Sequence, residues 1–314
     1  MVKSLQINLF SMSEPRVRMC FPNLRELSKV TPANLSIFKV KVYTIPNLLN
    51  KWEEVVDELI QLGMDISISP LLTDNYMART RDALNTESQY SCRLDDDIFM
   101  SSHVWDFLLS NIHKLEDQSV GAITPILTAG IPTVDYFILD FLDDTAITEI
   151  YKIFKQDNIL RSCWGIDYSD LYNNIEAMPN WNPDVFYAEL ANHSTPFKGV
   201  HPIRFSDNAS IFISQYVVDN FDRFMSKHKY HMDPMQGVHN THPFVFRTDT
   251  WKQSLEQMYD DFDELSLNVY MLTRNMTTYI IRNGYAIHMA YGCIPSQQYI
   301  EDAYYNCIET LNQE

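Results

Sequence analysis

Short segments that alternate apolar and polar residues recur between helical segments over the first 127 residues, and this order constrains the fold more than any other feature. The alternation is typical of half-buried strands and is present in residues 5–9 and 38–42. Residues 52–62 repeat apolar side chains at helical spacing instead, and Gly63 follows where a helix C-cap is expected. Strands that alternate with helices predict a largely parallel sheet.

The same order continues to the end of this first segment. Further strands are predicted at 65–70, 90–94 and 120–127, with helices over 75–85 and from Ser101 or Ser102 onward. Ligands bind at the carboxyl ends of the strands in sheets of this kind. The predicted fold class is therefore α/β, with a mixed, mainly parallel central sheet flanked by helices.

The pattern weakens after this segment. Residues from about 130 to 205 are rich in aromatic, Asn, Asp and Pro residues, and we interpret them as an insertion on the acceptor side. Regular patterns return as a strand at 209–214, a helix over 216–225, a long helix from about Glu264 to Asn283, and a last strand at 286–290. We therefore expect one catalytic domain over 1–314, made of 1–127, an insertion at 128–205, and 206–314.

An acidic triplet follows the predicted strand at 90–94. Residues i and i+2 of an extended segment point to the same side, so Asp95 and Asp97 are expected to face one cation while Asp96 points elsewhere. Mg²⁺ and Mn²⁺ take one or two carboxylates and complete their shells with water and phosphate. An isolated acidic triplet is more often a solvated turn or a helix cap. The strand in front of it favours a divalent-metal site that handles a phosphorylated substrate.

Composition narrows the class of ligand and the compartment. The formal net charge of −17 argues against broad binding to nucleic acid or to anionic membranes. The chain has 8 glycines and no glycine-rich phosphate loop. Five widely spaced cysteines suit reduced thiols, and no apolar run is long enough for a signal peptide or a membrane span. We expect a cytoplasmic protein.

Asn75-Tyr-Met-Ala-Arg79-Thr, followed by Tyr90-Ser-Cys-Arg-Leu-Asp95-Asp-Asp97, resembles the core of GT-A fold glycosyltransferases of the family 2 type, in which the strand ends in the DXD motif. The resemblance implies that Asp95 lies near the nucleotide ribose and Asp97 on the metal. It also implies that Asn75 and Arg79 help to hold the nucleotide-sugar. The residues expected to bind this donor are Asn75, Arg79, Asp95 and Asp96.

The resemblance extends to the C-terminal part. Asp263-Glu264, at the start of the predicted long helix, resembles the acidic motif that supplies the catalytic base in inverting members, although the usual order is Glu-Asp. The identity of the base and the stereochemical outcome therefore stay open, and an ordinary negative first helical turn is an equal alternative. His288 matches a histidine that binds metal in many members, which makes Asp95, Asp97 and His288 the predicted ligands. A lone histidine on an apolar strand is otherwise usually a core residue.

Together these features predict a glycosyltransferase dependent on Mn²⁺ or Mg²⁺ that moves a hexosyl or pentosyl group from a nucleoside diphosphate sugar to a hydroxyl acceptor. A glycan, a lipid, a protein side chain or a modified DNA base all fit as acceptor, and nucleic acid is expected in no other role. One alternative is a sugar-phosphate nucleotidyltransferase, which typically has a glycine-rich loop near its N-terminus. The other is a cation-binding interaction protein without enzymatic activity.

Overall fold

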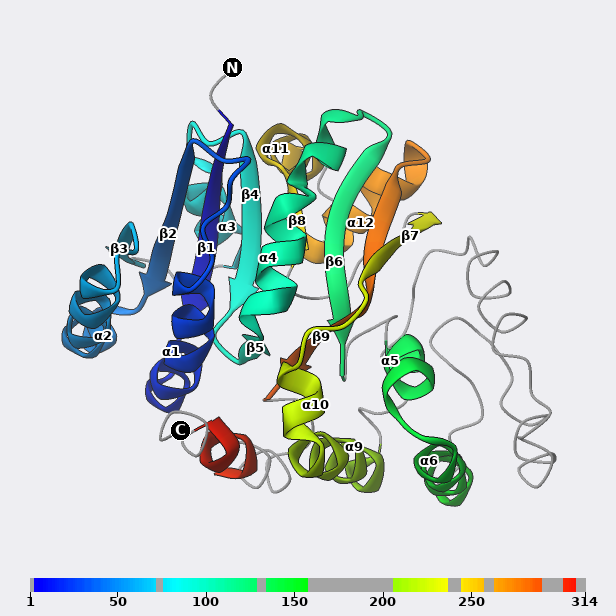
Figure 1. The fold of residues 1–314 in the computed structure, drawn as a ribbon. Helices are drawn as coiled ribbons and strands as arrows, with labels where there is room; N and C mark the ends of the chain where they lie inside the picture. Colours follow the sequence, from blue (N-terminus) through cyan, green and yellow to red (C-terminus); the bar gives the residue numbers. More distant parts are fainter. Residues whose placement is uncertain are drawn as a thin grey trace.

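The computed structural model describes residues 3–71, 76–128, 134–157, 206–236, 244–256, 263–289 and 302–308. They form one mixed sheet with helices against both of its faces (Figure 1), which confirms the predicted α/β class. No helix within these ranges combines the length and the apolar character needed to cross a membrane.

The strands of the sheet are β1 (Ser4–Ser11), β2 (Ile37–Thr44), β3 (Ile66–Pro70), β4 (Tyr90–Asp95), β5 (Ile98–Met100), β6 (Val120–Leu127), β7 (His231–Gln236), β8 (Phe244–Arg247) and β9 (Thr277–His288). Their order is β3-β2-β1-β4-β8-β6-β9-β5, and β7 also pairs with β9. Six strands run in one direction, while β5, β7 and β8 run against them. The three antiparallel strands lie in segments for which the sequence predicts no strand.

The helices are α1 (Glu14–Ser28), α2 (Leu49–Gln61), α3 (Tyr76–Leu84), α4 (Ser102–Ser110), α5 (Val134–Phe141), α6 (Asp144–Gln156), α9 (Asp207–Asp219), α10 (Phe221–Met225), α11 (Thr248–Glu256) and α12 (Asp263–Thr273), with 3-10 turns η1 (Pro46–Leu48) and η2 (Ile112–Glu116). Residues 302–308 are also helical. Figure 1 shows α1, α2 and α4 on one face of the sheet and α3, α11 and α12 on the other.

The alternation in β1 decides which face receives which helices. Leu5, Ile7 and Leu9 are fully buried in an apolar cluster that includes side chains of α1, α2 and α4. Gln6 and Asn8, on the opposite face, are also buried but belong to no apolar cluster. Burial of each large aliphatic side chain contributes about 1.5–3 kcal/mol, so the apolar face fixes the register of β1. The opposite face of β1, which carries Gln6 and Asn8, is available to adjoin a ligand site.

The predicted end of the helix at Gly63 is confirmed. α2 ends at Gln61, and Gly63 has a φ of 88°, in the left-handed region that glycine enters without steric cost. The chain then turns directly into β3. Together with β2, this strand extends the parallel part of the sheet beyond β1.

The strand predicted at 209–214 is wrong, because these residues lie in α9. The hydroxyl of Ser206 accepts a hydrogen bond from the Ala209 backbone N–H (2.9 Å), which caps the helix. Ala209, Ile213 and Val217 recur every four residues and are buried. This helical stripe is obscured in the sequence by the run of Ile and Phe. The helix predicted over 216–225 is divided at Asn220 between α9 and α10.

The long helix predicted from about Glu264 to Asn283 is wrong in its second half. α12 ends at Thr273. Two residues later, Asn275 adopts a left-handed φ of 52°. β9 then begins with two threonines and a tyrosine, which favour extended backbone. Gly284 thus lies inside β9, and the strand predicted at 286–290 overlaps the end of β9, which is at His288.

The division of the chain at 127 and 205 stays a prediction. The described part of 128–205 forms α5 and α6, which share an apolar cluster with α9 and α10. Residues 129–133 and 158–205 lie outside the described residues.

Candidate functional site

A cavity of about 150 Å³ lies at the carboxyl ends of β1 and β4, two neighbouring parallel strands. Three of the four residues predicted to bind the nucleotide-sugar line it, namely Arg79, Asp95 and Asp96. The other lining residues are Phe10, Met12, Arg16, Thr80 and Arg93. The structure therefore brings α1, α3 and two strand ends to one point at the edge of the sheet where ligands bind in folds of this class.

Polar contacts between β1 and the end of α3 help to place Arg79. The Gln6 side-chain amide donates to the Ala83 carbonyl (3.3 Å) and accepts from the Thr86 hydroxyl (3.0 Å). Because side chains alternate along a strand, Gln6 shares its face with Phe10, which lines the cavity. α3 is thus held over the polar face of β1, with Arg79 beside the strand end.

The three aspartates occupy different surroundings. β4 ends at Asp95, and Asp96 and Asp97 form the turn to β5, so the alternation expected for an extended segment does not reach Asp97. Asp95 lies 3.9 Å from the Arg93 guanidinium (Oδ1 to Nη2) and is the most exposed of the three. Asp96 accepts from the Met12 backbone N–H (3.2 Å).

Asp97 and His288 lie next to each other, as two of the predicted metal ligands should. The Nε2 atom of His288 is 3.6 Å from Oδ1 of Asp97. The pairing of β5 with β9 brings them together, since Ile98 is the register partner of His288 and the Met289 N–H donates to the Asp97 carbonyl (2.7 Å). The third predicted ligand, Asp95, lines the cavity instead. The metal-binding role of all three stays a prediction.

Negative charge is concentrated in this turn. Asp96 and Asp97 are 2% and 3% exposed, and Arg16 of α1 contacts both, with Nη1 3.3 Å from Asp96 Oδ1 and 3.2 Å from Asp97 Oδ2. Burial and then the neighbouring Asp97 carboxylate raise the pKa of Asp96 to about 7, which Arg16 offsets only in part. Arg16 thus compensates only part of the negative charge in this turn.

Part of the predicted site cannot be placed by its side chains. Asn75 lies outside the described residues, and so do the side chains of Asp263 and Glu264. The backbone of α12 does begin at Asp263, and this helix contacts α3, which carries Arg79. The roles proposed for the acidic pair stay predictions.

Arg16 and Arg93 line the cavity, although no motif in the sequence assigns either of them a role. Arg93 is 1% exposed within β4, and a charged residue between Cys92 and Leu94, just before an acidic triplet, is a sequence feature that indicates it. The sequence around Arg16 contains no comparable feature. Arg16 reaches the triplet only because α1 follows β1, whose neighbour in the sheet is β4.

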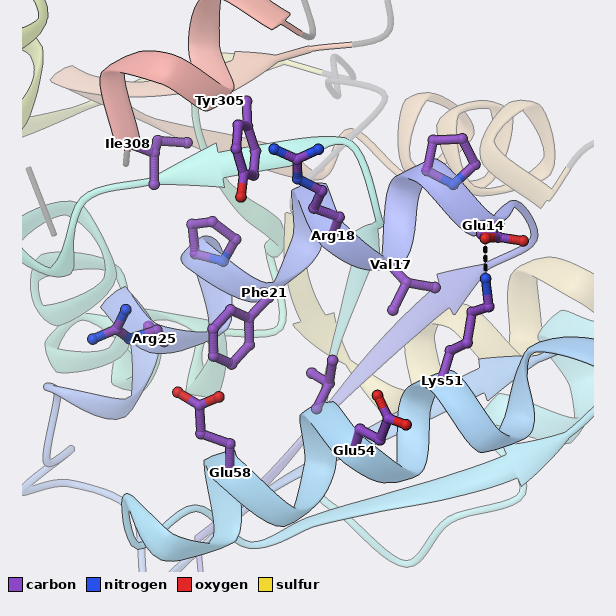
Figure 2. A pocket seen from close by; sticks show the side chains of 13 residues that line it. Glu14, Val17, Arg18, Phe21, Arg25, Lys51, Glu54, Glu58, Tyr305 and Ile308 are labelled. Atoms are coloured by element: carbon purple, nitrogen blue, oxygen red, sulfur yellow. Dashed lines mark ion pairs between the residues drawn. The ribbon is translucent and has the colours of Figure 1, made fainter. Parts of the chain in front are cut away.

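A second and larger hollow, of about 1180 Å³, lies between α1, α2 and residues 302–308. Figure 2 shows side chains of α1 and α2 facing each other across this groove, with Lys51 paired to Glu14 and the Arg18 guanidinium over the ring of Tyr305. Its charged residues include both signs, and all of them except the half-buried Arg25 are exposed. None of the residues predicted for catalysis, donor binding or metal binding lines it.

Neither a family model nor a curated protein matches the chain. Among solved structures, it is similar to a 4-diphosphocytidyl-2C-methyl-D-erythritol synthase from Anaerococcus prevotii, with 10% identity, a TM-score of 0.45, and coverage of 97% of this chain and 99% of that one. It is also similar to a cytidylyltransferase from Leptospira borgpetersenii, with 16% identity, a TM-score of 0.30, and coverage of 40% of this chain and 54% of that one. The likeness to the glycosyltransferase GlyE of Streptococcus pneumoniae has 10% identity, a TM-score of 0.27, and coverage of 33% of this chain and 26% of that one. Because all three TM-scores fall below 0.5, these likenesses do not assign a function.

Proposed function

We propose that this chain is a metal-dependent glycosyltransferase that moves a sugar from a nucleoside diphosphate sugar to a hydroxyl acceptor. The observation that carries the proposal is the convergence of Arg79, Asp95 and Asp96 on one cavity, directly beside the Asp97–His288 pair. These residues come from α3, from the end of β4 with the turn that follows it, and from β9, and the order of their motifs predicts them together.

The cavity has the charges that an anionic donor with hydroxyl groups requires. Arg16, Arg79 and Arg93 supply three guanidinium groups, whose planar forks suit phosphate oxygens. The side chain of Asp95 is 26% exposed, so its carboxylate is accessible to accept hydrogen bonds from ribose hydroxyls. An acidic protein thus concentrates positive charge where the diphosphate is proposed to lie.

Asp97 and His288 fit a divalent cation such as Mn²⁺ or Mg²⁺. The Oδ1 atom of Asp97 is buried and makes no hydrogen bond with any described residue, although it faces the His288 ring. Among the described residues, no group of three or more His, Cys, Asp or Glu side chains is arranged to hold a metal ion. A hard cation with few protein ligands and several from water and phosphate matches this arrangement. When bound, it would neutralise the departing diphosphate.

In the transfer step, the acceptor oxygen forms a bond to the anomeric carbon while the bond from that carbon to the diphosphate breaks. The acceptor proton goes to Asp263 or Glu264, at the start of α12. Arg79 and Arg93 hold the diphosphate, whose charge grows as the bond breaks. The acceptor is proposed only as a hydroxyl compound, and a glycan, a lipid, a protein side chain and a modified DNA base all meet that requirement.

A panel of nucleoside diphosphate sugars, each with Mn²⁺, Mg²⁺ or EDTA, tests the proposal by thermal shift and by slow release of nucleoside diphosphate. We expect at least one donor to raise the melting temperature and to be hydrolysed only with metal. Release of pyrophosphate from a nucleoside triphosphate and a sugar phosphate would instead show nucleotidyl transfer. If no nucleotide binds in the presence of metal, the proposal is wrong.

A further inference from the structure

We propose that Arg16 is a built-in counter-ion that holds Asp96 and Asp97 in the metal-free protein and gives way when a divalent cation binds beside Asp97. The inference rests on the proposed function, because it takes the Asp97–His288 pair as the cation site. No motif identifies Arg16, and the proposal gives its side chain one position without the cation and another with it.

The geometry of Arg16 resembles that of a bridging cation. A single atom, Nη1, lies 3.3 Å from an oxygen of Asp96 and 3.2 Å from an oxygen of Asp97. The two carboxylates belong to consecutive residues of a buried turn and repel each other at these distances. Without a positive charge between them the turn would be strongly destabilised, because buried carboxylates require a counter-charge.

The charges around the turn favour a second cation, and that cation would oppose Arg16 remaining where it is. One guanidinium faces two buried carboxylates, and the remaining oxygen of Asp97 faces His288 at 3.6 Å. A divalent ion at that oxygen would satisfy both negative charges. It would also repel the Arg16 guanidinium, which contacts the other oxygen of the same carboxylate.

The surroundings of Arg16 allow its side chain to change position. Its side chain is 32% exposed, whereas the carboxylates that it contacts are almost fully buried, and it also lines the cavity that contains Arg79. Because Arg16 already lines that cavity, a guanidinium released from Asp97 would be available there to the proposed anionic donor. Cation binding and donor binding would then favour each other through one side chain.

The test is the affinity for Mn²⁺ alone, measured by electron paramagnetic resonance of the free ion, in the wild type and in Arg16→Gln. The matched control is Arg18→Gln, which removes the same charge from the same helix but from a side chain that lies over Tyr305. We expect Arg16→Gln to bind Mn²⁺ on the order of tenfold more tightly than the wild type, because a competing charge about 4 Å away is lost. Arg18→Gln should match the wild type.

A thermal readout accompanies this experiment. Arg16→Gln should melt below the wild type without metal, and Mn²⁺ should close that difference. If the wild type binds Mn²⁺ and Arg16→Gln binds it equally or more weakly, the inference is wrong while the proposed cation site stands. If neither protein binds Mn²⁺, both the inference and the metal dependence of the proposed function fail.

Should Arg16→Gln not fold, Asp96→Asn provides a background in which the turn carries one carboxylate fewer. In that background Arg16 has only Asp97 to pair with, so Mn²⁺ should bind more weakly than to the wild type. Adding Arg16→Gln to Asp96→Asn should then restore tight Mn²⁺ binding. Equal affinities of the single and double variants would overturn the inference.

Discussion

The two hollows beside α1 differ in how their charges are arranged. The groove toward α2 is the larger, at about 1180 Å³ against 150 Å³, and its three basic and three acidic lining residues are balanced. In the groove, the charges are solvated or paired with each other, as Lys51 is with Glu14 (Figure 2). In the cavity, charges from α1, α3 and β4 converge beside the buried carboxylate of Asp96.

Burial and convergence of charge, and not size, set the cavity apart from the groove. Exposed ion pairs contribute little to stability and impose little order on a ligand, because water screens them. Buried charges of separate elements are costly and persist only where they satisfy one another or a ligand. We therefore expect substitutions in the cavity and in the groove to differ in their consequences.

The largest effect is expected for Asp97→Asn. The amide keeps the shape of the side chain but loses the charge that would bind the cation, so metal-dependent donor hydrolysis should fall about a hundredfold or more. The melting temperature without metal should not fall, because repulsion within the turn decreases. Glu54→Gln removes one acidic charge from the groove and should leave hydrolysis unchanged. Equal losses in the two variants would contradict the distinction between the cavity and the groove.

Arg93→Met should give the next largest effect, on stability. The guanidinium is 1% exposed and 3.9 Å from Asp95, and methionine fills a similar volume without a charge. Loss of one partner of a buried pair is destabilising, and partial exposure of Asp95 limits the cost to about 2 kcal/mol. Urea unfolding measures it. Arg25→Gln, in the groove, should change the free energy of unfolding by less than about 0.5 kcal/mol.

The sequence alone predicts several of the elements that surround the cavity. β1, β4, β6 and α3 were predicted because each carries its own apolar period, and Asp95 and Arg79 followed from motifs on them. Asp97 and His288 were predicted together by motif order, although only the pairing of β5 with β9 explains their contact.

What the sequence did not predict depends on distant partners. The residues of α9 have the composition of a strand, and only the cap at Ser206 and burial at every fourth position indicate a helix. Arg16 reaches Asp96 because β1 and β4 are neighbours in the sheet, and no local pattern encodes that neighbourhood. Short antiparallel strands such as β5 and β8 are likewise selected by their partners.

Arg79→Gln should weaken donor binding by roughly tenfold, the contribution of one charge-assisted hydrogen bond to phosphate. The Kd for the donor that is active in the panel, measured by titration calorimetry, checks this. Arg81→Gln removes an exposed charge from the same helix, outside the cavity, and should leave the Kd unchanged. An unchanged Kd in Arg79→Gln would remove α3 from the proposed donor site.

The smallest effect is expected in the groove itself. Lys51→Gln breaks the pair with Glu14, but both side chains are exposed, so the free energy of unfolding should change by less than about 0.5 kcal/mol. Donor binding should not respond. A loss of donor affinity here would mean that the groove, and not the cavity, receives the ligand.

The proposed site for a divalent cation lies beside Asp97 and His288, at the edge of the cavity. Anomalous diffraction from crystals grown with Mn²⁺ and a nucleoside diphosphate tests it most directly. We predict an anomalous peak within coordination distance of Asp97 and His288, with the diphosphate in density next to Arg79. A Mn²⁺ peak elsewhere, or nucleotide density in the groove between α1 and α2, would contradict the claim.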